Sequence, residues 1–239
     1  MNIRHGFCGI NRFTMAVATI GVLSCSGPLH AQTWVNANTS QFTGLALNTP
    51  TAVNFLGTGD LTMKRTSVIG SPIVAGTWNG TFTTPVGGEP NPDWVLGTRS
   101  YFELDCVTTG SAQSKVSYEF QYSGGLPINT KLVFIDLDWS EQVAIKAYDA
   151  SNTLIPFANT SVLFSPGGDA TPRYQDISWA ASSGATGLLR NTFNDSESNI
   201  IASISSAAAI HRLVYDFDFS QVDNSGATMR FQLAAVPEP

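Results

Sequence analysis

Histidine and cysteine are scarce in this sequence, which contains three residues of each type among 239. Two of each lie within the first 31 residues, so the rest of the chain holds only Cys106 and His211. A lone cysteine forms neither an intramolecular disulfide nor a cysteine-based zinc site. A single histidine also excludes the usual zinc hydrolases, which hold their metal through several histidines.

Several enzyme motifs are missing as well. The sequence has no His-Glu-x-x-His, no Gly-x-Ser-x-Gly and no glycine-rich phosphate or dinucleotide loop. A Ser-His-Asp triad would depend on His211, which stands at the start of a predicted strand, where a structural or surface histidine is the commoner case. If the chain is a hydrolase, a metal-activated water held by carboxylates is the better interpretation.

The first 31 residues have the organisation of a cleavable secretion signal. Arg4 and Arg12 precede an apolar run at residues 13–23, and the small residue Ala31 ends the segment. About a dozen apolar residues are too few to span a bilayer, and no later run is longer. We expect cleavage after Ala31 and a protein secreted to the periplasm, the cell surface or the extracellular matrix. A lipoprotein signal ending at Cys25 is the alternative.

Acidic residues outnumber basic ones. Cleavage after residue 31 leaves 10 Lys and Arg against 18 Asp and Glu, a net charge of −8. An acidic protein repels phosphate backbones, so we expect no nucleic-acid partner. Carboxylates on the surface are instead the ligands that Ca²⁺ prefers.

Helical periodicity is almost absent and alternation is frequent. In residues 115–122, Val116, Tyr118 and Phe120 share one face with polar side chains on the other, which predicts a half-buried antiparallel strand. Further predicted strands are residues 41–47, 61–69, 77–83, 101–108, 132–139, 143–148, 153–157, 161–164, 173–179, 213–219 and 228–233. Residues 124–127 predict a turn, and residues 198–210 fit a short helix or a strand. The pattern predicts an all-β fold, a single antiparallel, jelly-roll-like β-sandwich domain over residues 32–233.

Two of the predicted strands carry an Asp-x-Asp pattern: Asp136 with Asp138, and Asp216 with Asp218. Alternate residues of a strand share a face, so each pair presents two carboxylates on one side, roughly 7 Å apart. Two interpretations stay open, namely solvated side chains on an exposed face or ligands of Ca²⁺. The EF-hand is excluded because its glycine and its bidentate glutamate are missing. The oxygen-rich residues 191–199 are a second calcium candidate.

Trp94 follows a turn rich in glycine and proline at residues 87–92. We expect its ring to be exposed, and an exposed aromatic ring on a β-sandwich stacks on sugars. This residue is therefore a candidate for ligand stacking.

The sequence ends in Val236-Pro237-Glu238-Pro239. Val-Pro-Glu-Pro at the end of a secreted β protein resembles the sorting motif of the PEP-CTERM family of bacterial exported proteins. In that family an apolar span and a basic tail follow the motif, so residues 234–239 resemble a truncated tail. The resemblance implies an exopolysaccharide-forming Gram-negative bacterium and a place at the cell surface or in the matrix. It implies no activity.

Two functions follow from these features. The first is a non-catalytic secreted protein that binds calcium and an extracellular polysaccharide or a surface partner. The second is a calcium-dependent hydrolase of small esters or lactones, with Asp136, Asp138, Asp216 and Asp218 holding the metal. A glycosidase or lyase on the same fold is a third interpretation.

Overall fold

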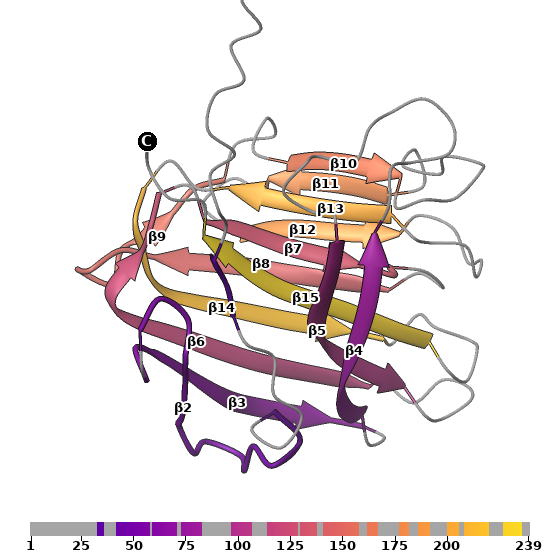
Figure 1. The fold of residues 1–239 in the computed structure, drawn as a ribbon, viewed down its shortest axis with the longest axis horizontal. Coiled ribbons are helices and arrows are strands. Elements are labelled where there is room, and N and C mark those ends of the chain that lie inside the picture. Colours follow the sequence, from indigo (N-terminus) through magenta and orange to yellow (C-terminus); the bar gives the residue numbers. More distant parts are fainter. Residues whose placement is uncertain are drawn as a thin grey trace, which may run out of the picture.

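The fold is a sandwich of two antiparallel sheets, here named sheet A and sheet B (Figure 1). The structure is a computed structural model and describes residues 33–35, 42–57, 59–70, 73–82, 97–106, 114–128, 130–137, 141–157, 162–166, 177–181, 186–191, 200–205, 208–219 and 227–235. Sheet A consists of β1 (Thr33–Trp34), β4 (Ile73–Phe82), β5 (Gly97–Cys106), β7 (Lys131–Ile135), β10 (Val162–Pro166), β13 (Ile200–Ser205) and β15 (Ala227–Ala235). Sheet B consists of β2 (Thr51–Val53), β3 (Leu61–Ile69), β6 (Lys115–Leu126), β8 (Gln142–Tyr148), β9 (Leu154–Ile155), β11 (Ile177–Ala181), β12 (Thr186–Asn191) and β14 (Ile210–Asp218). The predicted all-β sandwich is confirmed.

The strand order is that of a jelly roll. Four nested antiparallel pairs, β5 with β15, β6 with β14, β7 with β13 and β8 with β12, form one long two-stranded ribbon. The ribbon rolls up so that its pairs fall alternately in sheet A and sheet B. Within each sheet, neighbouring pairs of the rolled ribbon are joined by the β15–β7 and β14–β8 contacts. This rolling places β14 between β6 and β8, although β6 lies far from β14 in the sequence (Figure 1).

Alternation of apolar and polar residues determines which side of each strand faces the core. In β6, β8 and β14 every second residue is buried over most of the strand, as the period of two requires. The buried side chains of both sheets meet in an aromatic core around Phe231 of β15. Its ring centroid lies 5.0 Å from that of Phe217 and 5.7 Å from that of Tyr215, both on β14 in the opposite sheet.

Three predicted segments are wrong in part. Of residues 41–47, the described residues 42–47 form no strand, although Leu47 makes an isolated bridge to Arg65. The turn predicted at residues 124–127 lies largely within β6, which continues to Leu126 and contains Gly125 at a φ of +79°. The strand predicted at residues 132–139 ends at Ile135, because Asp136 adopts a φ of +59°, outside the extended region.

The remaining differences concern strand ends and short strands. The prediction left out β12, which occupies a position inside sheet B, and residues 200–205 of the ambiguous segment form β13. β15 runs to Ala235, two residues beyond the predicted domain boundary at 233, and pairs there with β1. The predicted signal at residues 1–31 and residues 236–239 lie outside the described residues. Within the described part of the chain, no helix is long and apolar enough to cross a membrane.

Candidate functional site

The centre of the outer face of sheet B is partly exposed, whereas the corresponding centre of sheet A is buried. On sheet A, Val133 and Gln232 point away from the core yet are fully buried. On sheet B, the outward residues of β6, β8 and β14 are at least partly exposed at every second position over most of each strand. Side chains on this face therefore contact solvent and are available to a partner.

The strand register arranges the outward side chains of sheet B in rows that cross the strands. The first row is Arg190, Gln142, Asp218, Lys115 and Ile69, and the second is Leu188, Ala144, Asp216, Ser117 and Ser67. The third row is Lys146, Val214, Glu119 and Lys64, and the fourth is Tyr148, Arg212, Gln121 and Thr62. We name these side chains the polar face, because most of them carry a charge or a hydrogen-bonding group.

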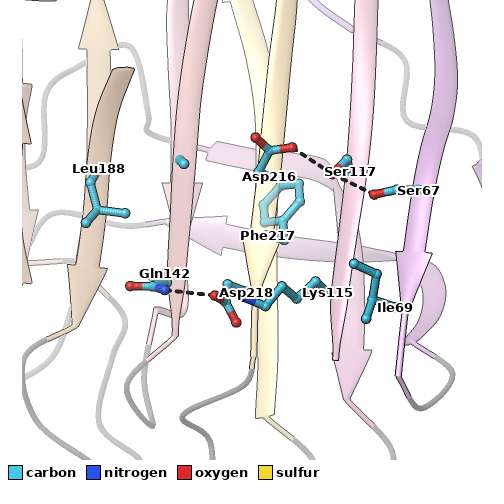
Figure 2. Close-up of a pocket in the computed structure, with 10 residues that line it drawn as sticks. Ser67, Ile69, Lys115, Ser117, Gln142, Leu188, Asp216, Phe217 and Asp218 are labelled. Carbon is cyan, nitrogen blue, oxygen red and sulfur yellow. Dashed lines mark hydrogen bonds and ion pairs between the residues drawn. The ribbon is translucent and has the colours of Figure 1, made fainter. Parts of the chain in front are cut away.

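Asp216 and Asp218 lie on this face, as the alternation of residues 213–219 predicted. Asp216 accepts a hydrogen bond from the Ser117 hydroxyl at 2.6 Å, and its other oxygen lies 2.8 Å from the ammonium of Lys146. Asp218 contacts the ammonium of Lys115 at 2.7 Å (Figure 2). The prediction that the two carboxylates share one face is confirmed, and their cationic neighbours are lysines.

Asp218 and Asp216 each connect β14 to both of its neighbouring strands, β6 and β8. Asp218 also accepts a hydrogen bond from the Gln142 amide of β8 at 3.0 Å (Figure 2). The Ser117 hydroxyl that binds Asp216 also meets the Ser67 hydroxyl of β3 at 2.9 Å. A chain of polar contacts therefore runs across four strands, and it holds both carboxylates in fixed positions.

Glu119 organises the other half of the polar face. It contacts Lys64 at 2.9 Å and Arg212 at 3.4 Å, and it accepts a hydrogen bond from Gln121. Partial burial raises the pKa of Glu119, but the hydrogen bond and charge of Lys64, together with Gln121 and Arg212, outweigh burial and lower the pKa. The guanidinium of Arg212 lies 3.5 Å from the centroid of the Tyr148 ring, a cation–π contact.

A shallow trough lies over the first and second rows. Ala144, Ser117 and Ser67 are small, while their neighbours in the first and third rows include Lys115, Gln142 and Lys146. The resulting depression has a volume of about 200 Å³ and is lined by residues of β3, β6, β8, β12 and β14 (Figure 2). Neighbouring strands lie about 4.8 Å apart, so a row from β12 to β3 extends about 19 Å.

Asp136 does not share this site. β7 ends at Ile135, and Asp136 forms an ion pair with Arg230 of β15 in sheet A. Arg230 lies between Met229 and Phe231, which are both buried in the core, so it points to the outer face of sheet A. The aspartates predicted as metal ligands therefore include residues on opposite faces of the sandwich. Asp138 lies outside the described residues.

The surroundings of Asp136 are crowded with charge. Arg230 also binds the Glu103 carboxylate at 2.6 Å, and Asp105 accepts a hydrogen bond from the Thr228 hydroxyl. Burial raises the pKa of Asp136 to about 6; Arg230 opposes this shift, and the charges of Glu103 and Asp105 add to it.

Calcium binding stays a prediction. Among the described residues, no group of three or more His, Cys, Asp or Glu side chains is placed to hold a metal ion. At Asp216 and Asp218, a calcium ion would compete with Lys146 and Lys115 for the same oxygens. Residues 192–199 of the second calcium candidate lie outside the described residues, as does Trp94.

His211 lines a separate hollow of about 270 Å³ together with Asp60 and Ser123. Within the part of the chain that the structure describes, these three side chains form no hydrogen bond with one another. The two oxygens of Asp60 accept hydrogen bonds from the backbone amides of residues 55, 56 and 57. The imidazole packs over Gly125, where an added Cβ would lie 2.7 Å from Nε2. The structural or surface role expected for His211 stays a prediction.

The sequence interpretation missed the partners of Asp216 and Asp218. Lys115 and Ser117 lie in the predicted strand at residues 115–122, and Lys146 lies in the one at residues 143–148. Alternation already placed each of them on the outward side of its strand. What the sequence did not contain was the order of the strands, which makes these residues neighbours of β14.

No protein-family model and no curated protein matches this chain. Among solved structures, the chain is similar to the enzymatically active domain of tailspike protein 4 of bacteriophage CBA120, with 11% identity and a TM-score of 0.36. It is also similar to an arabinose-bound α-L-arabinofuranosidase, MgGH51, with 10% identity and a TM-score of 0.29. The matches cover 74% and 72% of this chain but 19% and 23% of those chains. This chain therefore spans about a fifth of the length of either protein.

Proposed function

We propose that this protein is a non-catalytic binding module that holds an extracellular polysaccharide across the outer face of sheet B. The observation that supports this proposal is the trough over the first and second rows, which is lined by residues of five strands. A linear site of about 19 Å suits an extended polymer better than a single small molecule.

The chemistry of the trough suits a sugar chain. Sugar hydroxyls need donors and acceptors in fixed positions, and Asp216, Asp218 and Gln142 are held there by contacts with neighbouring strands. Because these groups are ordered before the ligand arrives, little conformational entropy is lost on binding. Leu188 and Ala144 add an apolar surface for the C–H groups of a sugar ring.

The arrangement of the carboxylates favours binding over hydrolysis. Glycoside hydrolysis uses two carboxyl groups that flank the scissile bond, one as acid and the other as base or nucleophile. Asp216 and Asp218 instead point the same way from one strand, and each contacts a lysine ammonium. Secretion of the protein, which this function requires, is proposed from the N-terminal segment alone.

The test is a substitution that fills the trough. Ala144→Tyr places a large ring in the second row on an outward position, where it does not disturb the core. Ile128→Tyr is the matched control, because Ile128 is an exposed residue in the connection between β6 and β7, away from the trough. We expect at least one of a panel of neutral and acidic polysaccharides to retard the protein in affinity electrophoresis.

Ala144→Tyr should abolish that retardation, and Ile128→Tyr should leave it unchanged. If no polysaccharide retards the protein, or if Ala144→Tyr binds as the unmodified chain does, the proposed function is wrong. Thermal melts of both variants establish that they are folded.

A further inference from the structure

The polar face has a charge opposite to that of the chain. Its outward side chains include five of the 12 Lys and Arg residues but three of the 18 Asp and Glu residues, so it carries two net positive charges. The cations are Lys64, Lys115, Lys146, Arg190 and Arg212, and the anions are Glu119, Asp216 and Asp218. The whole chain has a net charge of −6. A basic face on an acidic protein indicates an anionic partner at that face.

Lys115 lines the trough, and Lys146 stands in the row next to it. Lys115 of β6 belongs to the first row and Lys146 of β8 to the third, with Asp216 between them in the second row. Their side chains are 41% and 36% exposed, so both reach solvent while they contact Asp218 and Asp216. An ammonium carries three N–H donors, so each lysine has donors for a second anion in addition to its aspartate.

A nucleic acid fits this face less well. Single-stranded nucleic acids bind by stacking their bases on aromatic rings. On the described polar face the aromatic side chain is Tyr148, and the Arg212 guanidinium already covers its ring at 3.5 Å. Asp216 and Asp218 in the trough accept hydrogen bonds, and a sugar polymer brings a series of hydroxyl donors for them.

We propose that the trough selects a polysaccharide whose sugars carry carboxylates, and that Lys115 and Lys146 bind those carboxylates while Asp216 and Asp218 accept sugar hydroxyls. This inference rests on the proposed function and names its ligand class. Each ammonium then bridges one protein carboxylate and one ligand carboxylate, an arrangement of charge-assisted hydrogen bonds.

The experiment compares polygalacturonate with the same polymer after methyl esterification, which removes the charge and keeps the backbone. We expect binding of the purified protein to polygalacturonate, at least about tenfold weaker binding to the ester, and a marked loss of affinity between 50 and 500 mM NaCl. The Lys115→Gln/Lys146→Gln variant should lose at least about tenfold in affinity for polygalacturonate. Lys131→Gln, which removes a positive charge from sheet A, should not.

The outcomes separate this inference from the proposed function. Equal binding to both polymers, blocked by Ala144→Tyr, overturns the selection of carboxylates and keeps the polysaccharide trough. Binding to neither polymer, with retardation by a neutral glucan, overturns the inference in the same way. Absence of binding to every polysaccharide overturns both. A second variant, Lys146→Met with Asp216→Asn, removes one whole ion pair, so that a loss of binding is measured without an unpaired aspartate.

An oligonucleotide completes the test. Binding of oligothymidylate as strong as that of polygalacturonate, and sensitive to the same lysine substitutions, would overturn the sugar-polymer assignment. We expect none.

Discussion

The Asp216 carboxylate on β14 lies 2.8 Å from the Lys146 ammonium on β8, although the two residues are 70 positions apart in the sequence. The opposite side of the same carboxylate binds the Ser117 hydroxyl of β6 at 2.6 Å. One aspartate thus joins three adjacent strands on the outer face of sheet B. The predictions that follow test whether these contacts serve stability or ligand binding.

The Asp216–Lys146 pair should contribute little to stability. Its side chains are 35% and 36% exposed, and ion pairs of this kind contribute about 1 kcal/mol or less. A double-mutant cycle with Asp216→Asn and Lys146→Met, followed by urea denaturation, should give a coupling free energy below about 1 kcal/mol. A coupling of several kcal/mol would instead show that the pair serves mainly to hold the sheet together.

Tyr215→Phe should leave the protein as stable as before or make it more stable. The Tyr215 hydroxyl is completely buried and has no hydrogen-bond partner among the described residues. A buried polar group without a partner costs about 1 to 3 kcal/mol, which the substitution removes. Urea denaturation measures the change, and Phe231→Ala in the same core serves as the control, with an expected loss of about 3 to 5 kcal/mol. Clear destabilisation by Tyr215→Phe would show that the hydroxyl has a partner.

Asp136 should make the stability depend on pH between about 4 and 6. Its pKa is raised from 3.8 to about 6 in the folded protein, chiefly by burial. In this interval the folded state binds more protons than the unfolded state, so the contribution of Asp136 to the free energy of unfolding falls as the pH rises. Above about pH 6 both states are ionised at this residue and the contribution is constant.

The measurement for Asp136 is a difference between two proteins. Asp136→Asn removes the titration and keeps the positive φ, which asparagine tolerates. Thermal melts at pH 4, 5, 6 and 7 should show the variant gaining stability relative to the unmodified chain as the pH rises, because only the unmodified chain acquires a buried charge. Parallel curves would contradict the raised pKa.

Calcium should not raise the melting temperature of this protein by binding at Asp216 and Asp218. Ca²⁺ would have to displace the ammonium groups of Lys146 and Lys115 from Asp216 and Asp218. A ligand at a hundredfold excess over its Kd would add about 2.7 kcal/mol, a rise of several degrees. Melts in chelator and in millimolar CaCl₂ make the comparison. A rise that Asp216→Asn abolishes would place calcium at this carboxylate and support the metal site predicted from the sequence.

Much of the fold could be predicted from alternation alone. Residues 61–69 and 143–148 were placed as strands nearly as they occur in β3 and β8. The failures lie where a single residue departs from the extended conformation or where no alternation is present. Asp136 ends β7 through its positive φ, and β12 reads Thr-Gly-Leu-Leu-Arg-Asn, a segment without a clear period of two.

The candidate site shows the same division. The sequence placed Asp216 and Asp218 on one face, because side chains alternate along any strand. It also suggested an equivalence between these residues and Asp136 with Asp138, which the structure does not support for Asp136. β7 and β14 lie in different sheets, and Asp136 binds Arg230 of sheet A.

The amino-acid sequence by itself determined the class of fold and the side of each strand that faces the core, because both depend on the local period of apolar residues. The tertiary structure alone decided which polar side chains meet. Rolling the ribbon of nested strand pairs brings β6 and β8 to either side of β14 and so gives Asp216 its serine and lysine partners. Contacts between strands depend on order and register, and these are set by the packing of the whole core rather than by any one segment.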